Sequence, residues 1–175
     1  MVVIDYFDDL ELSVCRRVNA LSRRRAVRAF FAAVSRLGDY PAWVGFGLVC
    51  LVQQGPQAPV FVVQTLLTAT LGVVVYKLLK HRLVRERPYI RHSGHIECGT
   101  APLDRYSFPS GHTLHATSFA MLYGSYEPSM LVVLVPFALL VAASRVILGL
   151  HYPSDVVAGA AIGAAIAATS ISIFA

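Results

Sequence analysis

Charged side chains are scarce in this sequence. Asp, Glu, Lys and Arg account for 14% of the 175 residues, hydrophobic residues account for 56%, and the mean hydropathy is +0.61. A soluble domain ordinarily carries far more charge. The composition therefore predicts an integral membrane protein, and the length predicts a single domain over residues 1–175.

Cysteines are also few. Cys15, Cys50 and Cys98 are an odd number at unrelated spacings, so no disulfide framework or redox motif is predicted. A cleaved secretory signal is not expected either, because residues 1–12 have no basic segment ahead of a short apolar core. Membrane insertion is therefore expected to depend on internal apolar segments.

Motifs for nucleic-acid binding are absent. The formal net charge of +5 at pH 7 would permit such binding, but the sequence has no recognition helix, zinc finger or basic sheet with stacking aromatics. No nucleic-acid partner is expected. Anionic lipid is the partner that better fits a basic and apolar chain.

Residues 10–37 combine an apolar stripe with a basic one. Apolar residues recur mostly at steps of three and four, while arginines crowd the other positions. This pattern predicts an amphipathic helix at the membrane surface, and a soluble helix packed on a core is the alternative. Gly38, Asp39 and Pro41 are expected to mark its end.

Five apolar stretches follow and predict the fold. We expect an all-α catalytic bundle over residues 40–175, with about five transmembrane helices and the amphipathic helix beside them. If each stretch crosses the bilayer once, the polar clusters described next all emerge on one side. In the last stretch, Gly159 and Gly163 have a spacing that suits close helix packing. The stretches are residues 40–53, 59–80, 113–126, 130–150 and 156–175.

Three polar clusters interrupt these stretches. The first holds Lys80 and Arg87 at the end of an apolar run, where a bare charge would be costly. Fixed cations of this kind suit a phosphoryl group, because Arg supplies paired donors and Lys a point charge. Anchoring of a helix end at the membrane interface is the alternative.

The second cluster is Pro109-Ser110-Gly111-His112, directly before a predicted helix. The backbone N–H groups of Ser110 and Gly111, with the Ser110 hydroxyl, would point at an anion at the positive end of the helix dipole. An imidazole at His112 suits a general acid near neutral pH. A plain helix N-cap at Ser110 is the alternative.

The third cluster is Ser144-Arg145 with His151 and Asp155. If a helix begins near Pro153, the Asp155 carboxylate can accept a hydrogen bond from one imidazole nitrogen of His151, and the other nitrogen can attack phosphorus. This is nucleophilic catalysis through a phosphohistidine. A capping Asp beside an interfacial His is the alternative.

Together, in this order, the three clusters resemble the motifs of the type 2 phosphatidic acid phosphatase family, which shares its fold with vanadium haloperoxidases. The resemblance covers about residues 40–170. It implies a phosphatase that uses no metal and no cofactor, with His151 as nucleophile, Asp155 orienting it and His112 as general acid. The family typically has six spanning helices, whereas five are counted here. The resemblance also implies that phosphoryl oxygens are bound by Lys80, Arg87, Ser110, Gly111 and Arg145.

A lipid phosphate or diphosphate is the expected substrate, because its tail can stay in the bilayer while its phosphate reaches a site at the membrane surface. Phosphatidic acid, phosphatidylglycerophosphate and polyprenyl diphosphates are the candidates within the resemblance. Two alternatives remain open. One is a vanadate-dependent haloperoxidase, and the other is a lipid-phosphate-binding membrane protein without turnover.

Other polar residues carry weaker signals. His92, His95 and Cys98 have the spacing of metal ligands but lack a fourth ligand, so no metal site is predicted. His115 lies one turn beyond His112 and is expected to pack within a helix or to face the same cavity. A role in head-group selectivity is expected of Asp104, Arg105 and Tyr106.

Basic residues indicate the orientation. The loops on the side away from the clusters, residues 53–57 and 126–129, have no Lys or Arg, whereas the cluster side carries the basic N-terminal helix. The positive-inside rule then predicts a cytoplasmic active site. The compact size predicts a bacterial inner-membrane protein, although most bacterial members of the family are expected to face outward.

Overall fold

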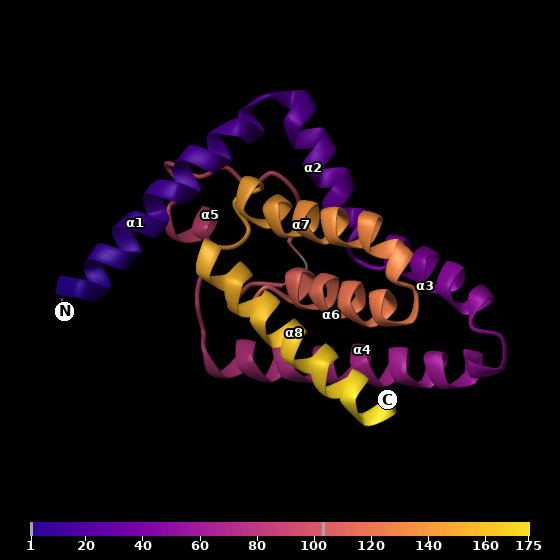
Figure 1. Cartoon of the computed structure of the whole chain (residues 1–175). Helices are drawn as coiled ribbons and strands as arrows, with labels where there is room; N and C mark the ends of the chain where they lie inside the picture. Colours follow the sequence, from indigo (N-terminus) through magenta and orange to yellow (C-terminus); the bar gives the residue numbers. More distant parts are fainter. Residues whose placement is uncertain (1, 103) are drawn as a thin grey trace.

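Helices dominate the structure (Figure 1). The computed structural model describes residues 2–102 and 104–175, with side chains from residue 10 onward. Within these residues there is no β-strand, and one isolated β-bridge joins Glu86 to Tyr106. The predicted all-α fold is confirmed. The α-helices are α1 (Val2–Asn19), α2 (Arg25–Leu37), α3 (Pro41–Gln53), α4 (Ala58–Arg82), α5 (Pro88–Arg91), α6 (Gly111–Tyr126), α7 (Leu131–Ile147) and α8 (Pro153–Phe174).

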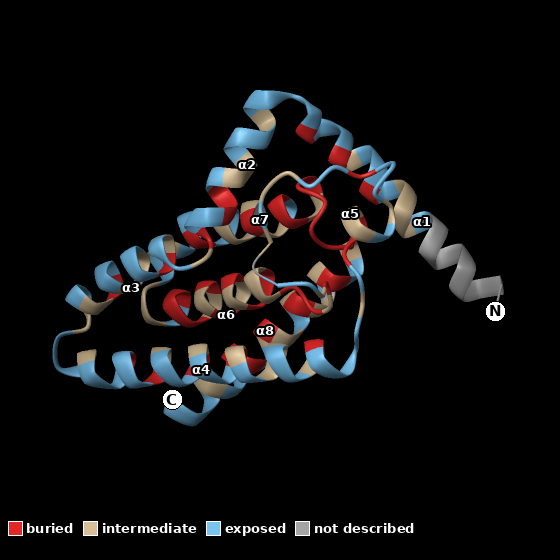
Figure 2. Ribbon diagram, turned by 180° about the vertical axis from the view of Figure 1, so that it is seen from behind, coloured by how far each residue is buried: buried red, intermediate tan, exposed pale blue. Residues whose placement is uncertain are grey.

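Helix α6 lies at the centre of the bundle, in contact with α8, α7 and α4. Figure 2 shows most turns of α6 buried, whereas α3 and α4 are exposed along much of their length. A Cβ atom at Gly159 of α8 would lie 2.5 Å from the carbonyl oxygen of Ser110, and one at Gly163 would lie still closer to that of Leu114. Any larger residue would force the helices apart, so the close packing predicted from this spacing is confirmed.

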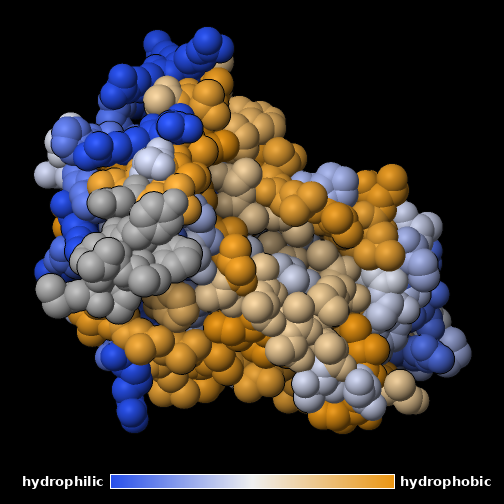
Figure 3. Space-filling model, turned by 60° about the vertical axis from the view of Figure 1, so that its left-hand side comes forward, coloured by the Kyte–Doolittle hydropathy of each residue, from blue (hydrophilic) through white to orange (hydrophobic). Residues whose placement is uncertain are grey.

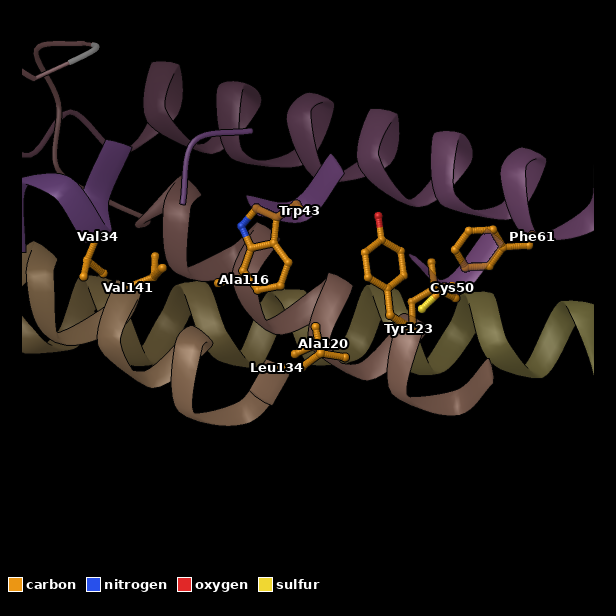
Figure 4. Close-up of a cluster of buried hydrophobic side chains, with 10 residues drawn as sticks. Val34, Trp43, Cys50, Phe61, Ala116, Ala120, Tyr123, Leu134 and Val141 are labelled. Atoms are coloured by element: carbon orange, nitrogen blue, oxygen red, sulfur yellow. The ribbon is translucent and has the colours of Figure 1, made fainter. Parts of the chain in front are cut away.

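The apolar core lies between α3, α4, α6 and α7 (Figure 4). Trp43 of α3 packs its ring against Phe119 of α6 and Phe137 of α7, with centroids 5.8 and 5.3 Å apart. Phe61 of α4 lies against Tyr123 of α6 at 5.5 Å. Contacts between large rings hold these four helices together. They fix α6 in place, and the second polar cluster begins at its N-terminal end.

Three helical segments are long and apolar enough to cross a membrane, namely Gly55–Arg82, Pro128–Ile147 and Pro153–Phe174. Large apolar side chains remain exposed on them, for example Val132 at 76% and Val157 at 68%. Figure 3 shows apolar side chains spread over much of one face, with hydrophilic ones gathered toward its edges. Such a surface is stable against lipid rather than water. The predicted multi-pass membrane bundle is confirmed.

The count of five spanning helices stays a prediction. Residues 40–53 and 113–126, which complete that count, form the shorter helices α3 and α6, of 13 and 16 residues. A straight crossing of the hydrocarbon core takes about 20 residues. Length alone therefore supports three crossings.

The predicted single amphipathic helix over residues 10–37 is wrong. The structure has α1 and α2 at an angle (Figure 1), separated by a 3₁₀ turn over Ala20–Arg23. The side chain of Asn19 leaves the helix pattern to donate hydrogen bonds to the carbonyl oxygens of Glu97 and Ile147, both at 3.0 Å. The Ser22 hydroxyl donates to the Asn19 carbonyl oxygen at 2.8 Å. The Ser22 bond competes with helical hydrogen bonds for the Asn19 carbonyl oxygen, and the two Asn19 side-chain bonds hold the end of α1 against the bundle.

Candidate active site

The three polar clusters meet at one cavity of about 360 Å³. The end of α4, the segment that follows it, the start of α6 and the turn between α7 and α8 all contribute to its wall. The convergence that the helix count predicted is therefore present. Of the residues proposed from the sequence, the cavity is lined by Lys80, Arg87, Gly111, His112, Arg145 and His151.

His151 lies in the turn between α7 and α8, with 1% of its surface exposed. Gly149, at φ +73°, lets the chain turn there. The His151 Nε2 atom lies 3.2 Å from Nη1 of Arg87. Burial, followed by the positive charges of Arg87 and Arg145, lowers the pKa of His151 well below its ordinary value of 6.5. The imidazole is therefore neutral at pH 7 and keeps a lone pair that can act as a nucleophile.

Asp155 stands in the first turn of α8, behind His151. Its Oδ2 atom lies 3.6 Å from Nδ1 of His151, which is too long for a hydrogen bond. The same oxygen accepts a hydrogen bond from the Tyr152 N–H at 2.8 Å, and Oδ1 accepts one from Arg85 at 2.7 Å. The carboxylate is thus adjacent to the imidazole as expected, but its strongest contacts are to other groups.

Arg85 was not predicted as a site residue. Its Nη2 atom pairs with Glu11 of α1 at 2.6 Å, and Nη1 donates to Asp155. Burial works against its charge, but the carboxylates of Asp155 and Glu11 raise the pKa of Arg85 above its ordinary value. The sequence placed Arg85 between Lys80 and Arg87, in a run of cations that is typical of a helix end at the membrane interface, so nothing marked it as a site residue.

Lys80 and Arg87 are both held by Asp104. The Lys80 Nζ atom lies 2.7 and 2.6 Å from the two Asp104 carboxylate oxygens. Arg87 donates from Nη2 to Oδ1 at 2.8 Å, from Nε to the Asp104 carbonyl oxygen at 2.9 Å, and from Nη1 to the Leu150 carbonyl oxygen at 2.8 Å. Burial would raise the pKa of Asp104, but Lys80 and Arg87 hold it below its ordinary value. This pair of cations therefore has an ionised carboxylate as counter-ion.

Arg145 enters the cavity from the last turn of α7. It is 2% exposed, and its Nη1 atom donates to the Ser35 hydroxyl. Among the residues that the structure describes, its buried Nε atom has no hydrogen-bond partner. A buried guanidinium with an unused donor suits an anionic ligand.

The start of α6 differs in part from the expectation. The Ser110 N–H donates to the Asp155 carbonyl oxygen at 3.0 Å, and its hydroxyl lies 3.0 Å from the Thr113 hydroxyl and accepts from the Thr113 N–H at 3.5 Å. Ser110 is thus the N-cap of α6, the alternative weighed above. It does not point its N–H at an anion, because that group is already bonded to α8. Gly111 and His112 line the cavity.

Asp39 was missed as a site residue. The sequence indicated only a helix end there, but the turn between α2 and α3 brings the Asp39 carboxylate into contact with Nε2 of His112. Nothing in the local sequence pattern relates positions 39 and 112, so this pair emerges only from the packing of α2 and α3 against the bundle.

The remaining candidates lie around or outside the cavity. His115 lines its wall and packs between Tyr76 and Phe119, with ring centroids 5.9 and 5.7 Å away. Tyr106 also lines it, whereas Arg105 is exposed. His92, His95 and Cys98 follow α5. Among the side chains that the structure describes, those of residues 10–102 and 104–175, no group of three His, Cys, Asp or Glu could hold a metal ion.

Comparison with known proteins identifies the family. The family model of the PAP2 superfamily matches residues 61–175. A decaprenylphosphoryl-5-phosphoribose phosphatase of Mycobacterium tuberculosis is 40% identical over 93 residues, which are 52% of this chain and 49% of that protein. A lipid A 1-phosphatase of Rhizobium johnstonii is 34% identical over 101 residues, 55% of this chain and 41% of that protein. The chain thus spans about half the length of the curated relatives it matches.

Two solved structures share the fold. The crystal structure of Aquifex aeolicus LpxE superposes with a TM-score of 0.79 at 26% identity, covering 93% of this chain and 95% of that one. A transmembrane PAP2 type phosphatidylglycerolphosphate phosphatase from Bacillus subtilis superposes with a TM-score of 0.73 at 21% identity, covering 96% and 86%. The match of the family model to most of the chain and the shared fold agree with the motifs, and the chain belongs to the PAP2 superfamily.

Proposed function

We propose that this protein is a membrane lipid phosphatase that removes a phosphate from a lipid phosphate or diphosphate. The observation that carries the proposal is the position of His151, whose Nε2 atom lies 3.2 Å from Arg87 Nη1 in a cavity also lined by Lys80 and Arg145. A neutral nucleophile beside three cations is what attack on an anionic phosphoryl group requires.

The reaction follows from this arrangement. His151 Nε2 attacks phosphorus, the bond from phosphorus to the lipid oxygen breaks, and His112, which enters the step protonated and paired with the Asp39 carboxylate, gives that oxygen its proton. Water then attacks the phosphohistidine, His112 takes a proton from the water, and the P–N bond breaks to release orthophosphate. Asp155 favours the positive imidazole of the intermediate. The negative charge on phosphorus is stabilised by Lys80, Arg87 and Arg145, with the N–H of Gly111 as a further donor.

The chemistry of the substrate follows from where the cavity lies. It begins at the end of α4, and the outer face of that helix is apolar and exposed along its length, for example at Leu66 and Leu78. An acyl or prenyl tail can therefore stay in lipid while its phosphate enters the cavity. Phosphatidic acid, phosphatidylglycerophosphate and polyprenyl diphosphate types are the substrates to test.

Released phosphate from a panel of these lipids tests the proposal. We expect the purified full chain to hydrolyse at least one of them in detergent, and to do so equally with and without EDTA, because the proposed groups include no metal. A water-soluble phosphate ester without a tail serves as the matched control and should be a poorer substrate. Absence of hydrolysis across the panel, or its loss with EDTA, would contradict the proposal.

We infer further that the site faces the cytoplasm of a bacterial inner membrane. The argument is the positive-inside rule, applied to the exposed arginines of α1 and α2, such as Arg17, Arg25 and Arg28. Cys98 allows a test because it is exposed, whereas Cys15 and Cys50 are buried. The N–H of the next residue, Gly99, donates to the Leu148 carbonyl oxygen, so Cys98 lies on the same side as His151.

A membrane-impermeant maleimide should therefore label Cys98 in inverted inner-membrane vesicles but not in intact spheroplasts. The Cys98→Ser variant should remain unlabelled in both, which shows that the buried thiols do not react. Labelling in intact spheroplasts would place the site on the outer face and overturn this orientation.

We also propose that the 175 residues act as one domain, with α1 and α2 as part of the catalytic unit. Glu11 of α1 supports this, since one carboxylate oxygen pairs with Arg85 at 2.6 Å and the other accepts from the Ser154 N–H at 2.7 Å. The Glu11→Gln variant should lower the thermal midpoint of unfolding and the rate of lipid hydrolysis together. A change in neither would argue against one unit.

A further inference from the structure

The Asp104 carboxylate binds Lys80 and Arg87, two of the cations that were expected to hold phosphate. Its carboxylate accepts from Lys80 through both oxygens, at 2.7 and 2.6 Å, and from Arg87 Nη2 at 2.8 Å. These are the short distances of charge-assisted hydrogen bonds. The carboxylate thus binds the same groups, by the same kind of contact, as a phosphoryl oxygen would.

The carboxylate also lies close to where phosphorus must sit. Arg87 holds Asp104 Oδ1 with Nη2 while its Nη1 lies 3.2 Å from Nε2 of His151. A phosphoryl group placed for attack by His151 and bound by this guanidinium would compete with the Asp104 carboxylate for the same donors. Both anions cannot use them fully at once.

Of these three side chains, that of Asp104 is the one that can turn out of the cavity. The side chains of Lys80 and Arg87 are 9% and 2% exposed, whereas that of Asp104 is 39% exposed. Turning the carboxylate toward water returns it to a favourable solvent, but leaving the two cations buried without an anion would be costly. Displacement therefore requires an incoming anion, and it costs little once one arrives.

The backbone around Asp104 can stay in place during such an exchange. Its carbonyl oxygen accepts from Arg87 Nε at 2.9 Å, the Tyr106 carbonyl oxygen lies 3.2 Å from Lys80 Nζ, and the Ser107 N–H donates to the Arg85 carbonyl oxygen at 2.8 Å. These bonds do not involve the carboxylate. Rotation of one side chain is enough.

We propose that Asp104 is an internal competitor of the phosphoryl group, which neutralises the site at rest and weakens its hold on substrate and on released orthophosphate. The proposal rests on the proposed function only in assigning the cavity to a phosphate. A phosphate monoester with two negative charges displaces a single carboxylate more readily than a singly charged diester does. Asp104 thereby favours terminal phosphates and speeds product release.

Binding of orthophosphate to the detergent-solubilised full chain tests this directly. In the Asp104→Asn variant, whose amide is a weaker acceptor for both cations, we expect the Kd for orthophosphate in calorimetry to fall about tenfold. Glu86→Gln is the matched control, because it also removes one negative charge, and the Glu86 carboxylate lies 3.9 Å from the exposed Arg105 and outside the cavity lining. It should leave the Kd unchanged.

The direction of the change in Kd distinguishes an Asp104 that competes with phosphate from one that supports the phosphate-binding cations. If Asp104 merely positions Lys80 and Arg87, the Asn variant will bind orthophosphate more weakly. That result, an unchanged Kd, or no binding by either protein would overturn the proposal. Thermal unfolding with and without orthophosphate checks the fold, and the variant should gain more in Tm from the ligand than the wild type. This experiment measures binding of orthophosphate rather than turnover, so its result does not depend on whether the lipid assay shows hydrolysis.

Discussion

Replacing His151 with alanine is expected to lower the rate of lipid phosphate hydrolysis by about a thousandfold or more, because the nucleophile is lost. The Nε2 atom of His151 faces Arg87, and no covalent intermediate can form on an alanine at this position. The measurement is released phosphate per mole of purified protein. His95→Ala is the matched control, since His95 is exposed and outside the cavity lining, and it should keep full activity.

Folding of the His151→Ala protein needs its own check. His151 is buried, so the change leaves a small void that costs stability. His151→Gln fills the space without supplying a nucleophile, and its thermal unfolding should lie close to that of the wild type. Undiminished hydrolysis by either folded variant would exclude His151 as the nucleophile.

Arg87→Lys is expected to lower kcat/KM by about a hundredfold or more, although it keeps the charge. All three guanidinium nitrogens are in use: Nη1 reaches the Leu150 carbonyl oxygen and His151, while Nη2 and Nε reach Asp104. A lysine ammonium is a single point charge and lacks the planar set of donors of a guanidinium. It therefore cannot bind the transferring phosphoryl group and these neighbours at the same time.

Arg82→Lys is the matched control for that variant. Arg82 is exposed at the end of α4 and does not line the cavity, so the same exchange should have no effect there. Steady-state kinetics with one lipid substrate are sufficient. Equal kcat/KM values for the two variants would mean that Arg87 contributes only its charge, and would contradict a role for its several nitrogens in holding the phosphoryl group.

The fold was predictable where helices face lipid. The runs that became α4, α7 and α8 are apolar on every side over most of their length, because one face meets lipid and the other meets protein. The division between α1 and α2 was not predictable. It depends on Asn19 reaching the backbone of Glu97 and Ile147, which lie far away in the sequence.

The site was predictable to the extent that its residues belong to sequence motifs. The alternation of the apolar stretches and the resemblance of the motifs predicted that His112, Arg145 and His151 share one site, and the structure brings them to one cavity. Their partners were not predictable. Asp39 and Arg85 are ordinary polar residues in turns and helix ends until the packed bundle places them beside His112 and Asp155.

Transfer of phosphorus to His151 is the measurement that bears most directly on the proposed chemistry. After rapid mixing of the full chain with a lipid labelled in its terminal phosphate and quenching in alkali, we expect protein-bound label that is stable to alkali and labile to acid, located on His151. Asp155→Asn should reduce it and His151→Ala should remove it. Label on another residue, or rapid hydrolysis with no labelled protein at any time, would contradict a phosphohistidine at this position.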